Sequence, residues 1–132
     1  MQDFSWLVSH SLVSATRREF DWVFEFDRGV AIVVSCLWRL LHDNRIGVTS
    51  QDDGHQFGLP APVDATAILN QRLAGRVVER VEVQSQTLDL SLHFSGGLIL
   101  QFVPDSSGYE AWILTTPIEQ FIAAGGGEIF RV

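Results

Sequence analysis

The sequence predicts an α+β fold that consists mainly of antiparallel strands, with two pseudo-repeated β-hairpin halves and one amphipathic helix between them. Three observations predict it: an internal repeat, an alternation of apolar residues in both copies of the repeat, and a helix-capping pattern between the copies. A chain of 132 residues is long enough to bury one core. We therefore expect a single domain that spans residues 1–132.

The repeat consists of segments 20–34 and 88–102, which align without gaps. In each segment, apolar residues alternate on both sides of a short loop that ends in Gly29 or Gly97. This pattern is typical of a β-hairpin whose last loop residue has a positive φ, which favours glycine. Duplication explains the match, and convergence of two half-buried hairpins is the alternative. The predicted buried residues are Phe20, Trp22, Phe24, Phe26, Ile32, Leu88, Leu90, Leu92, Phe94, Leu98 and Leu100.

Further strands are expected around the two hairpins, because short apolar runs flank them. A glycine run at 125–127 predicts a tight turn or a close approach of two backbones, followed by a closing strand. The half-repeats then cover approximately 6–50 and 76–115, with a loop and a helix at 51–75. The expected strands outside the hairpins are 7–15, 37–41, 46–49, 76–84, 108–115 and 127–132.

The helix is predicted by signals at both of its ends. Asp64 is placed to cap the first turn, and Gly75 stands just past the last turn. Segment 51–63 before it is rich in Gly, Pro and Asp, and we interpret it as an ordered loop that Phe57 and Leu59 anchor. The apolar face of the helix consists of Ala65, Ile68, Leu69 and Leu73, with Arg72 at the same spacing.

Charge and composition exclude several classes of partner. Sixteen acidic residues stand against nine arginines and no lysine, which gives a formal charge of −7 and disfavours nucleic acid as a partner. No apolar run approaches the length of a membrane-spanning helix, so we expect no membrane partner. The one cysteine, Cys36, has no disulfide partner in the chain, and no secretory signal is visible at Met1. We therefore expect a cytoplasmic protein.

The candidates for chemistry do not form a recognised motif. His42, Asp43, Asp52, Asp53 and His55 carry ligand atoms, but their spacing matches no calcium loop or zinc helix, and we interpret them as turn residues. The serines lack the glycine-flanked elbow of a hydrolase, and no phosphate-binding glycine motif is present. The sequence predicts no metal, no cofactor and no catalytic residue, and it favours a protein that is not an enzyme.

Aromatic and acidic residues remain as candidates for binding a partner. Trp112, beside Tyr109 and Glu110, is of the type that dominates protein interfaces, and packing in the core is the alternative for it. Acidic residues close to predicted loop tips complete the set. The candidate partner-binding residues are Asp52, Asp53, Asp105, Tyr109, Glu110 and Trp112.

Several segments resemble a group of small bacterial proteins of unknown function. They are FGLPAPVD and LAGRVVERVEV around the predicted helix, the hairpin that ends at Gly97, GYEAW, and GGGEI near the C-terminus. Together they cover most of the chain. The resemblance implies a domain without a known activity, and some similar proteins are suspected to be immunity partners of toxins. It brings no catalytic residues with it.

Three functional hypotheses follow from these observations. The first is a non-enzymatic protein of a binding or immunity type, whose acidic surface meets a basic protein. The second is a small-ligand-binding domain or a cryptic enzyme, with a cavity between the halves lined by aromatic residues and by His42, Asp53 or His55. The third is a structural homo-oligomer, a homodimer formed by pairing of exposed strand edges.

Overall fold

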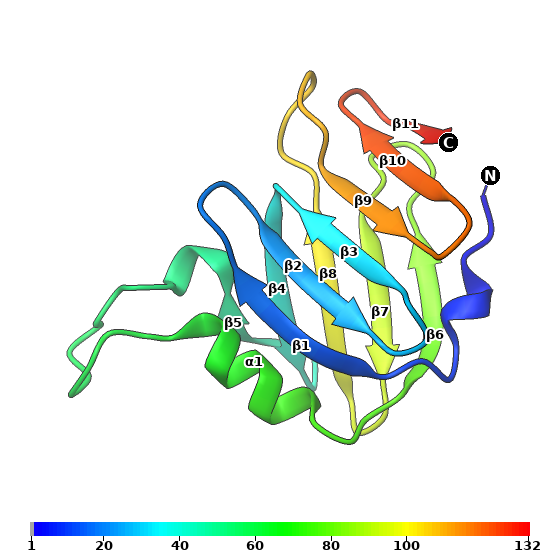
Figure 1. The fold of residues 1–132 in the computed structure, drawn as a ribbon. Coiled ribbons are helices and arrows are strands. Elements are labelled where there is room, and N and C mark those ends of the chain that lie inside the picture. Colours follow the sequence, from blue (N-terminus) through cyan, green and yellow to red (C-terminus); the bar gives the residue numbers. More distant parts are fainter. Residues whose placement is uncertain (1) are drawn as a thin grey trace.

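The computed structural model describes residues 2–132, and its strands form two antiparallel sheets that pack face to face (Figure 1). One α-helix lies between the two groups of strands, so the expected mainly antiparallel α+β class is confirmed. The elements are η1 (Ser5–Leu7), β1 (Leu12–Arg17), β2 (Trp22–Phe26), β3 (Ala31–Val34), β4 (Leu37–His42), β5 (Arg45–Thr49), η2 (Ser50–Asp52), α1 (Ala65–Leu73), β6 (Val78–Val83), β7 (Leu90–Phe94), β8 (Leu98–Val103), β9 (Trp112–Thr115), β10 (Gln120–Ala124) and β11 (Glu128–Arg131).

The two halves of the chain exchange strands between the sheets. One sheet has the order β1-β2-β3-β9-β10-β11, and the other has the order β5-β4-β8-β7-β6. Each half therefore gives its first three strands to one sheet and its remaining strands to the other, two (β4 and β5) from the first half and three (β9, β10 and β11) from the second. The chain crosses between the sheets at 35–36 and again at 104–111, next to the pairs Val34↔Trp112 and Leu37↔Val103.

Both segments of the sequence repeat form the expected hairpins, β2–β3 and β7–β8. Residues 95–97 connect β7 and β8, and residues 27–29 lie between Phe26 and Val30, which are joined by a backbone hydrogen bond of 2.8 Å just before β3. The last residue of each three-residue loop is Gly29, with φ 74°, or Gly97, with φ 77°. A side chain at either position would be strained at this φ. The shared loop length and backbone conformation explain why the two segments align without gaps.

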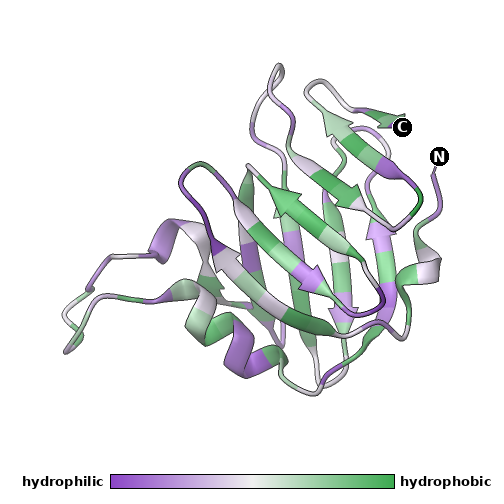
Figure 2. Cartoon of the chain, viewed as in Figure 1, coloured by the Kyte–Doolittle hydropathy of each residue, from purple (hydrophilic) through white to green (hydrophobic). Residues whose placement is uncertain are grey.

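The core lies between the two sheets, and the strands alternate between hydrophobic and hydrophilic residues (Figure 2). At its centre, the Phe24 ring packs edge-to-face against Trp38 and Phe102, with centroid distances of 5.7 Å and 5.0 Å. Every residue that the repeat predicts to be buried is buried, except Phe20. The alternation therefore identifies the inward face of both hairpins correctly.

The prediction for Phe20 is wrong, because its side chain is 86% exposed. The chain turns at residues 18–21, where Arg18 pairs with Asp21 through both carboxylate oxygens, and β2 begins only at residue 22. The residue at the equivalent position of the second half, Leu88, is buried, and its carbonyl oxygen accepts a hydrogen bond from the Trp112 indole at 2.9 Å. The halves differ at this point.

Two helical segments close the open sides of the sandwich. Helix α1 contacts β1 and β5, so it covers a side between the sheets rather than a sheet face. Asp64 caps its first turn by accepting a hydrogen bond from the backbone N–H of Ala67, as the sequence predicts. Asn70 exchanges two hydrogen bonds with the backbone of Ala15, and these satisfy polar groups on the outer edge of β1. On the other side, η1 contacts β6.

Some predicted strand boundaries need correction. Residues 7–11 are not a strand but contain the end of η1, and residues 108–111 belong to a loop that precedes β9. Strand β10 was not expected, because its short sequence ends in two alanines, which do not favour strands. The expected strands at 37–41, 46–49, 76–84 and 127–132 correspond to β4, β5, β6 and β11.

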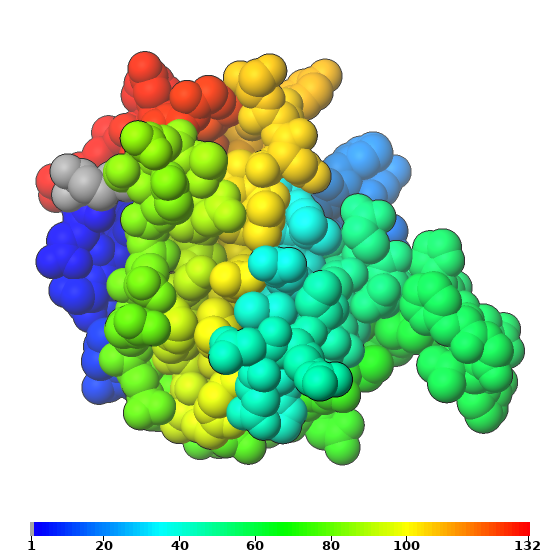
Figure 3. Space-filling view, turned by 180° about the vertical axis from the view of Figure 1, so that it is seen from behind, coloured from blue at the N-terminus to red at the C-terminus, as the bar shows by residue number. Residues whose placement is uncertain are grey.

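The loop between η2 and α1 projects from the body of the molecule (Figure 3). Phe57 and Leu59 were expected to anchor it, but their side chains are 66% and 50% exposed. The loop is instead ordered by its own backbone, because Gly54 donates a hydrogen bond to Val63 and Val63 donates one to His55. None of the helices in the described part of the chain is long and apolar enough to span a membrane.

Candidate functional site

The chain crossings and several turns gather at one end of the sandwich, which we call the crossover end (Figures 1 and 3). The strand registers place the β1–β2 turn, the β6–β7 turn and the β10–β11 turn there, next to both crossings between the sheets. The loop between β8 and β9, residues 104–111, is the longest of these connections. Loops on a rigid sandwich are common positions for binding residues.

The crossover end is strongly acidic. Its acidic residues are Glu19, Asp21, Asp52, Asp53, Asp89, Asp105, Glu110 and Glu128. Among the described residues, the arginines at this end are Arg17 and Arg18, and both are already neutralised: Arg17 pairs with Asp53 at 2.6 Å and Arg18 pairs with Asp21 at 2.5 Å. Excess negative charge therefore remains on this surface.

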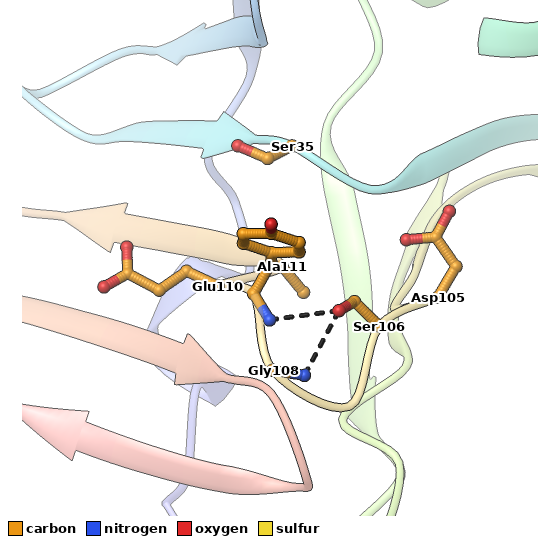
Figure 4. A pocket seen from close by; sticks show the side chains of 7 residues that line it. Ser35, Asp105, Ser106, Gly108, Glu110 and Ala111 are labelled. Carbon is orange, nitrogen blue, oxygen red and sulfur yellow. Dashed lines mark hydrogen bonds between the residues drawn. The ribbon is translucent and has the colours of Figure 1, made fainter.

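Three adjoining hollows cover this end, and Asp105 lines all of them. The first has a volume of about 520 Å³ and lies between Ser35 at one crossing and residues 105–111 at the other (Figure 4). The second, of about 340 Å³, shares Ser35 and also contains Asp53 and His55. Both halves of the chain therefore contribute to the same concave surface.

Local hydrogen bonds shape the loop that carries Asp105. The Ser106 hydroxyl oxygen accepts hydrogen bonds from the backbone N–H groups of Gly108 and Tyr109, at 3.1 Å and 3.0 Å (Figure 4). A side chain at Gly125 would lie only 2.5 Å from the backbone nitrogen of Gly108, so the β10–β11 turn packs directly against the loop. The glycine run thus forms the tight β10–β11 turn, with Gly126 and Gly127 at positive φ, and also allows two backbones to approach closely, so both sequence interpretations hold.

The carboxylates of Asp105 and Glu110 are available for a partner. No hydrogen bond or ion pair engages either carboxylate among the described residues. The two side chains point away from each other (Figure 4), so they do not form the paired carboxylates of an acid–base catalyst. The neighbouring Cys36 thiol has a pKa raised to about 12, first by burial and then by the negative charge of Asp105. Cys36 is therefore not an activated nucleophile.

The other predicted binding residues, Asp52, Asp53 and Trp112, are not free to bind a partner as Asp105 and Glu110 are. Asp52 accepts a hydrogen bond from the Thr49 N–H at 2.9 Å, and Asp53 accepts one from the Ala65 N–H at 2.8 Å as well as pairing with Arg17. Both acids belong to the crossover end but are occupied in structural contacts. The side chain of Trp112 is fully buried, so the surface position suggested for it is wrong and the core alternative holds.

Large exposed aromatic side chains surround the hollows. Tyr109 is 83% exposed in the loop, and Phe20, in the adjacent β1–β2 turn, is slightly more exposed. Phe57, on the projecting loop next to His55, is stacked on the His55 ring with a centroid distance of 5.6 Å. Exposed aromatic residues that border a polar hollow are typical of a surface that binds another protein.

The remaining candidates for chemistry lie apart from one another. His42 is at the opposite end of β4 from the crossover end, and Asp43 with Asn44 forms the tight β4–β5 turn at positive φ. His93, on the outer face of its sheet, bonds Glu82 at 2.6 Å. Within residues 2–132, no group of three or more His, Cys, Asp or Glu side chains is arranged to hold a metal ion.

One cluster was missed by the sequence reasoning. His10 is 6% exposed, and its Nδ1 atom lies 2.7 Å from the carboxylate of Asp27, beside the indole of Trp6. The sequence signal for it is slight, a histidine in an apolar segment before the first strand. The cluster lies at the other end of the sandwich from Asp105.

With this geometry established, comparison with known proteins adds no further assignment: no family model, no curated protein and no solved structure matches the chain.

Proposed function

We propose that this protein is a non-enzymatic binding protein of the immunity type, whose crossover end binds a basic protein. The observation that carries the proposal is the acidic concave surface around Asp105, where the carboxylates of Asp105 and Glu110 face solvent without an internal partner. A cationic surface would satisfy these charges, and complementary charge accelerates the encounter of two proteins.

The distribution of charge along the sandwich supports this orientation. The crossover end carries the excess of acidic residues described above, whereas toward the other end Arg28, Arg45 and Arg76 offset the charges of Asp27, Asp43 and Glu79. The six residues of β4 separate the two ends by about 20 Å. This separation exceeds the screening distance of about 8 Å at physiological salt. A basic partner is therefore attracted to one end of the molecule in particular.

The exposed aromatic side chains supply the apolar part of the proposed interface. Tyr109 and Phe20 flank the hollows, and tyrosine in particular is enriched among residues that dominate binding energy. Because the loop of Tyr109 is held by Ser106 and packed against the β10–β11 turn, little ordering is required on binding. The sequence resemblance to suspected immunity proteins favours a cationic toxin as the partner.

The test compares partner binding by three proteins: the natural chain, the double variant Asp105→Asn/Glu110→Gln, and Asp43→Asn. The Asp43 side chain is 81% exposed in the turn at the other end, and asparagine also tolerates its positive φ, so this variant is the control for loss of an exposed carboxylate away from the crossover end. Each protein is used to capture partners from cells of the source, and the captured partner is then purified and identified.

The expected partner is a basic protein that binds the natural chain and Asp43→Asn equally. The double variant should associate with it about tenfold more slowly, and raising salt from 50 to 300 mM should slow the natural chain in the same way. Tyr109→Ala should mainly accelerate dissociation. A partner that is not basic, equal loss with Asp43→Asn, or binding that ignores salt would contradict the proposal.

A further inference from the structure

The edge strands of the two sheets differ in how they are protected. Helix α1 contacts both β1 and β5, and Asn70 bonds the backbone of Ala15 in β1. At β6, the Val78 carbonyl accepts a hydrogen bond from the Ser9 N–H, and the Val78 N–H donates to the His10 carbonyl. The pairing of each of these three strands with its neighbour also contains a register shift. Cover and irregularity of this kind prevent an edge from pairing with another chain.

Strand β11 is the remaining edge, and it lacks these protections. It is the last strand of the six-stranded sheet (Figure 1), and its pairing with β10 is regular from Phe121↔Arg131 to Ala124↔Glu128. The strand contains no proline, and within residues 2–132 no backbone hydrogen bond from another element reaches its outer edge. A regular, uncovered edge is a template for a further strand.

The hydrogen bonds to β10 show which backbone groups of β11 face outward. Gln120 and Val132 exchange two backbone hydrogen bonds, of 3.0 Å and 2.9 Å. The direction of these groups alternates along an antiparallel strand, so the N–H and C=O groups of Ile129 and Arg131 face away from β10. They are placed symmetrically about Phe130. An antiparallel second copy of β11 therefore brings Ile129 of each chain opposite Arg131 of the other and pairs all of these groups.

Neighbouring registers are less favourable. A shift in one direction would place Arg131 opposite Arg131 of the copy, and like charges in this position repel each other. A shift in the other direction would require Gly127 to pair, but its φ of 94° is not that of a strand. In the register centred on Phe130, no two like charges are directly opposite.

The side chain of Phe130 ends an apolar row that crosses the outer face of this sheet. Successive strand pairs form the row Val23, Val33, Ile113, Ile122 and Phe130. The other members of the row are half-buried, but Phe130 is 52% exposed because no strand lies beyond β11. A copy of β11 would supply the missing neighbour.

The outer face of the other sheet shows the contrast. Its corresponding row is polar and consists of Arg39, Gln101, Ser91 and Glu82. Arg39 Nε donates to Gln101 at 2.7 Å, and the Gln101 amide donates to the Ser91 hydroxyl at 3.2 Å. A polar row can end in solvent at β6, whereas the apolar row ends in an exposed phenylalanine.

From these observations we infer that two copies of this chain associate by antiparallel pairing of their β11 strands, about a two-fold axis at Phe130. Each Phe130 side chain then lies between Ile122 of its own chain and Phe130 of the other. The antiparallel arrangement directs the two acidic crossover ends away from each other, which limits the repulsion between chains that each have a charge of −7. No residue of β11 lines the hollows around Asp105, so both copies can still bind a basic protein there.

Sedimentation at increasing protein concentration tests the inference. We expect a weak dimer with a dissociation constant on the order of 0.1 mM, because one short strand buries less surface than a standard interface. Phe130→Lys and Phe130→Glu should each raise this constant at least about tenfold, because like charges then face each other across the axis. A mixture of the two variants should restore the dimer, because opposite charges face each other. Ile46→Lys, at a 60% exposed position of the covered edge β5, is the control and should dimerise normally.

A disulfide tests the register separately. Residues 130 of the two copies form a pair without hydrogen bonds, with Cα atoms about 4.5 Å apart, which is within the range that a disulfide bridges. Phe130→Cys should therefore form a covalent dimer in an oxidising buffer at least about tenfold faster than Ile46→Cys. The natural Cys36 is buried and does not compete.

Four results would overturn the inference: a natural chain that stays monomeric at about 1 mM, tenfold above the expected dissociation constant; a dimer that Phe130→Lys leaves intact; a mixture of the charged variants that associates no better than either alone; or equal disulfide formation by Phe130→Cys and Ile46→Cys. An edge that pairs only with a strand of another protein would give the first of these results. All four concern self-association, so none bears on the capture of a basic protein by the crossover end.

Discussion

Replacement of Phe24 by alanine tests the packing of the two sheets. The Phe24 side chain is fully buried and contacts Trp38 from the other sheet and Phe102 beside it, both edge-to-face. Truncation of a buried phenylalanine costs about 3 to 5 kcal/mol. A domain of 132 residues has a total stability of about 7 to 20 kcal/mol, so the variant should fold with a large loss of stability.

Phe20→Ala is the matched control, because the sequence alternation alone places both phenylalanines in the core. Phe20 is exposed in the structure, so its replacement should change the free energy of unfolding by less than about 0.5 kcal/mol. Urea unfolding followed by tryptophan fluorescence measures both values, provided that the m-values agree. Equal costs for the two variants, or a cost below 1 kcal/mol for Phe24→Ala, would refute the described packing.

Three other predictions concern single contacts. Trp112→Phe should cost about 1 to 3 kcal/mol in unfolding free energy, because it leaves the buried carbonyl of Leu88 without its donor; a negligible change would contradict this. Cys36 should resist a thiol reagent at pH 8 in the folded protein and react only on unfolding. With a pKa of about 12, only about one thiol in ten thousand is ionised at this pH. Rapid labelling of the folded protein would contradict the described burial of Cys36. Asp21 has a pKa lowered by its bond to Arg18, so the ion pair stabilises the fold above the unfolded pKa of about 3.9, and this stability is lost as pH falls further. The difference in unfolding free energy between the natural chain and Asp21→Asn should therefore shrink below about pH 4, and a difference that is independent of pH would exclude the ion pair as its source.

Features encoded by neighbouring residues were predicted well from the sequence. The cap at Asp64 and the positive φ at Gly29 and Gly97 depend on local backbone chemistry. The inward face of each hairpin follows from the alternation of apolar residues. The same alternation does not show where a strand begins, and this explains the error at Phe20, where an ion pair between Arg18 and Asp21 closes the turn first.

Features that depend on distant contacts were not predictable in this way. Nothing in the sequence around residues 35–36 indicates that the chain leaves one sheet for the other. Of the candidate partner-binding residues, Asp105, Tyr109 and Glu110 lie together around one hollow because they share a loop. His10 and Asp27 belong to different elements and meet only through tertiary structure, so no local pattern identifies them.

The exchange of strands between the sheets affects how the molecule assembles. Neither sheet can be completed from one half of the chain, because the sheet of β1–β3 needs β9, β10 and β11 from the second half and the sheet of β6–β8 needs β4 and β5 from the first. The first half, as it is synthesised, therefore exposes unpaired edges on β3 and β4 until β9 and β8 are available. Cleavage of the projecting loop near Phe57 would leave two fragments, and each fragment has the strand edges with which the other must pair. The fold is thus suited to reconstitution from two separately expressed fragments, which would associate through the strand pairs β3–β9 and β4–β8.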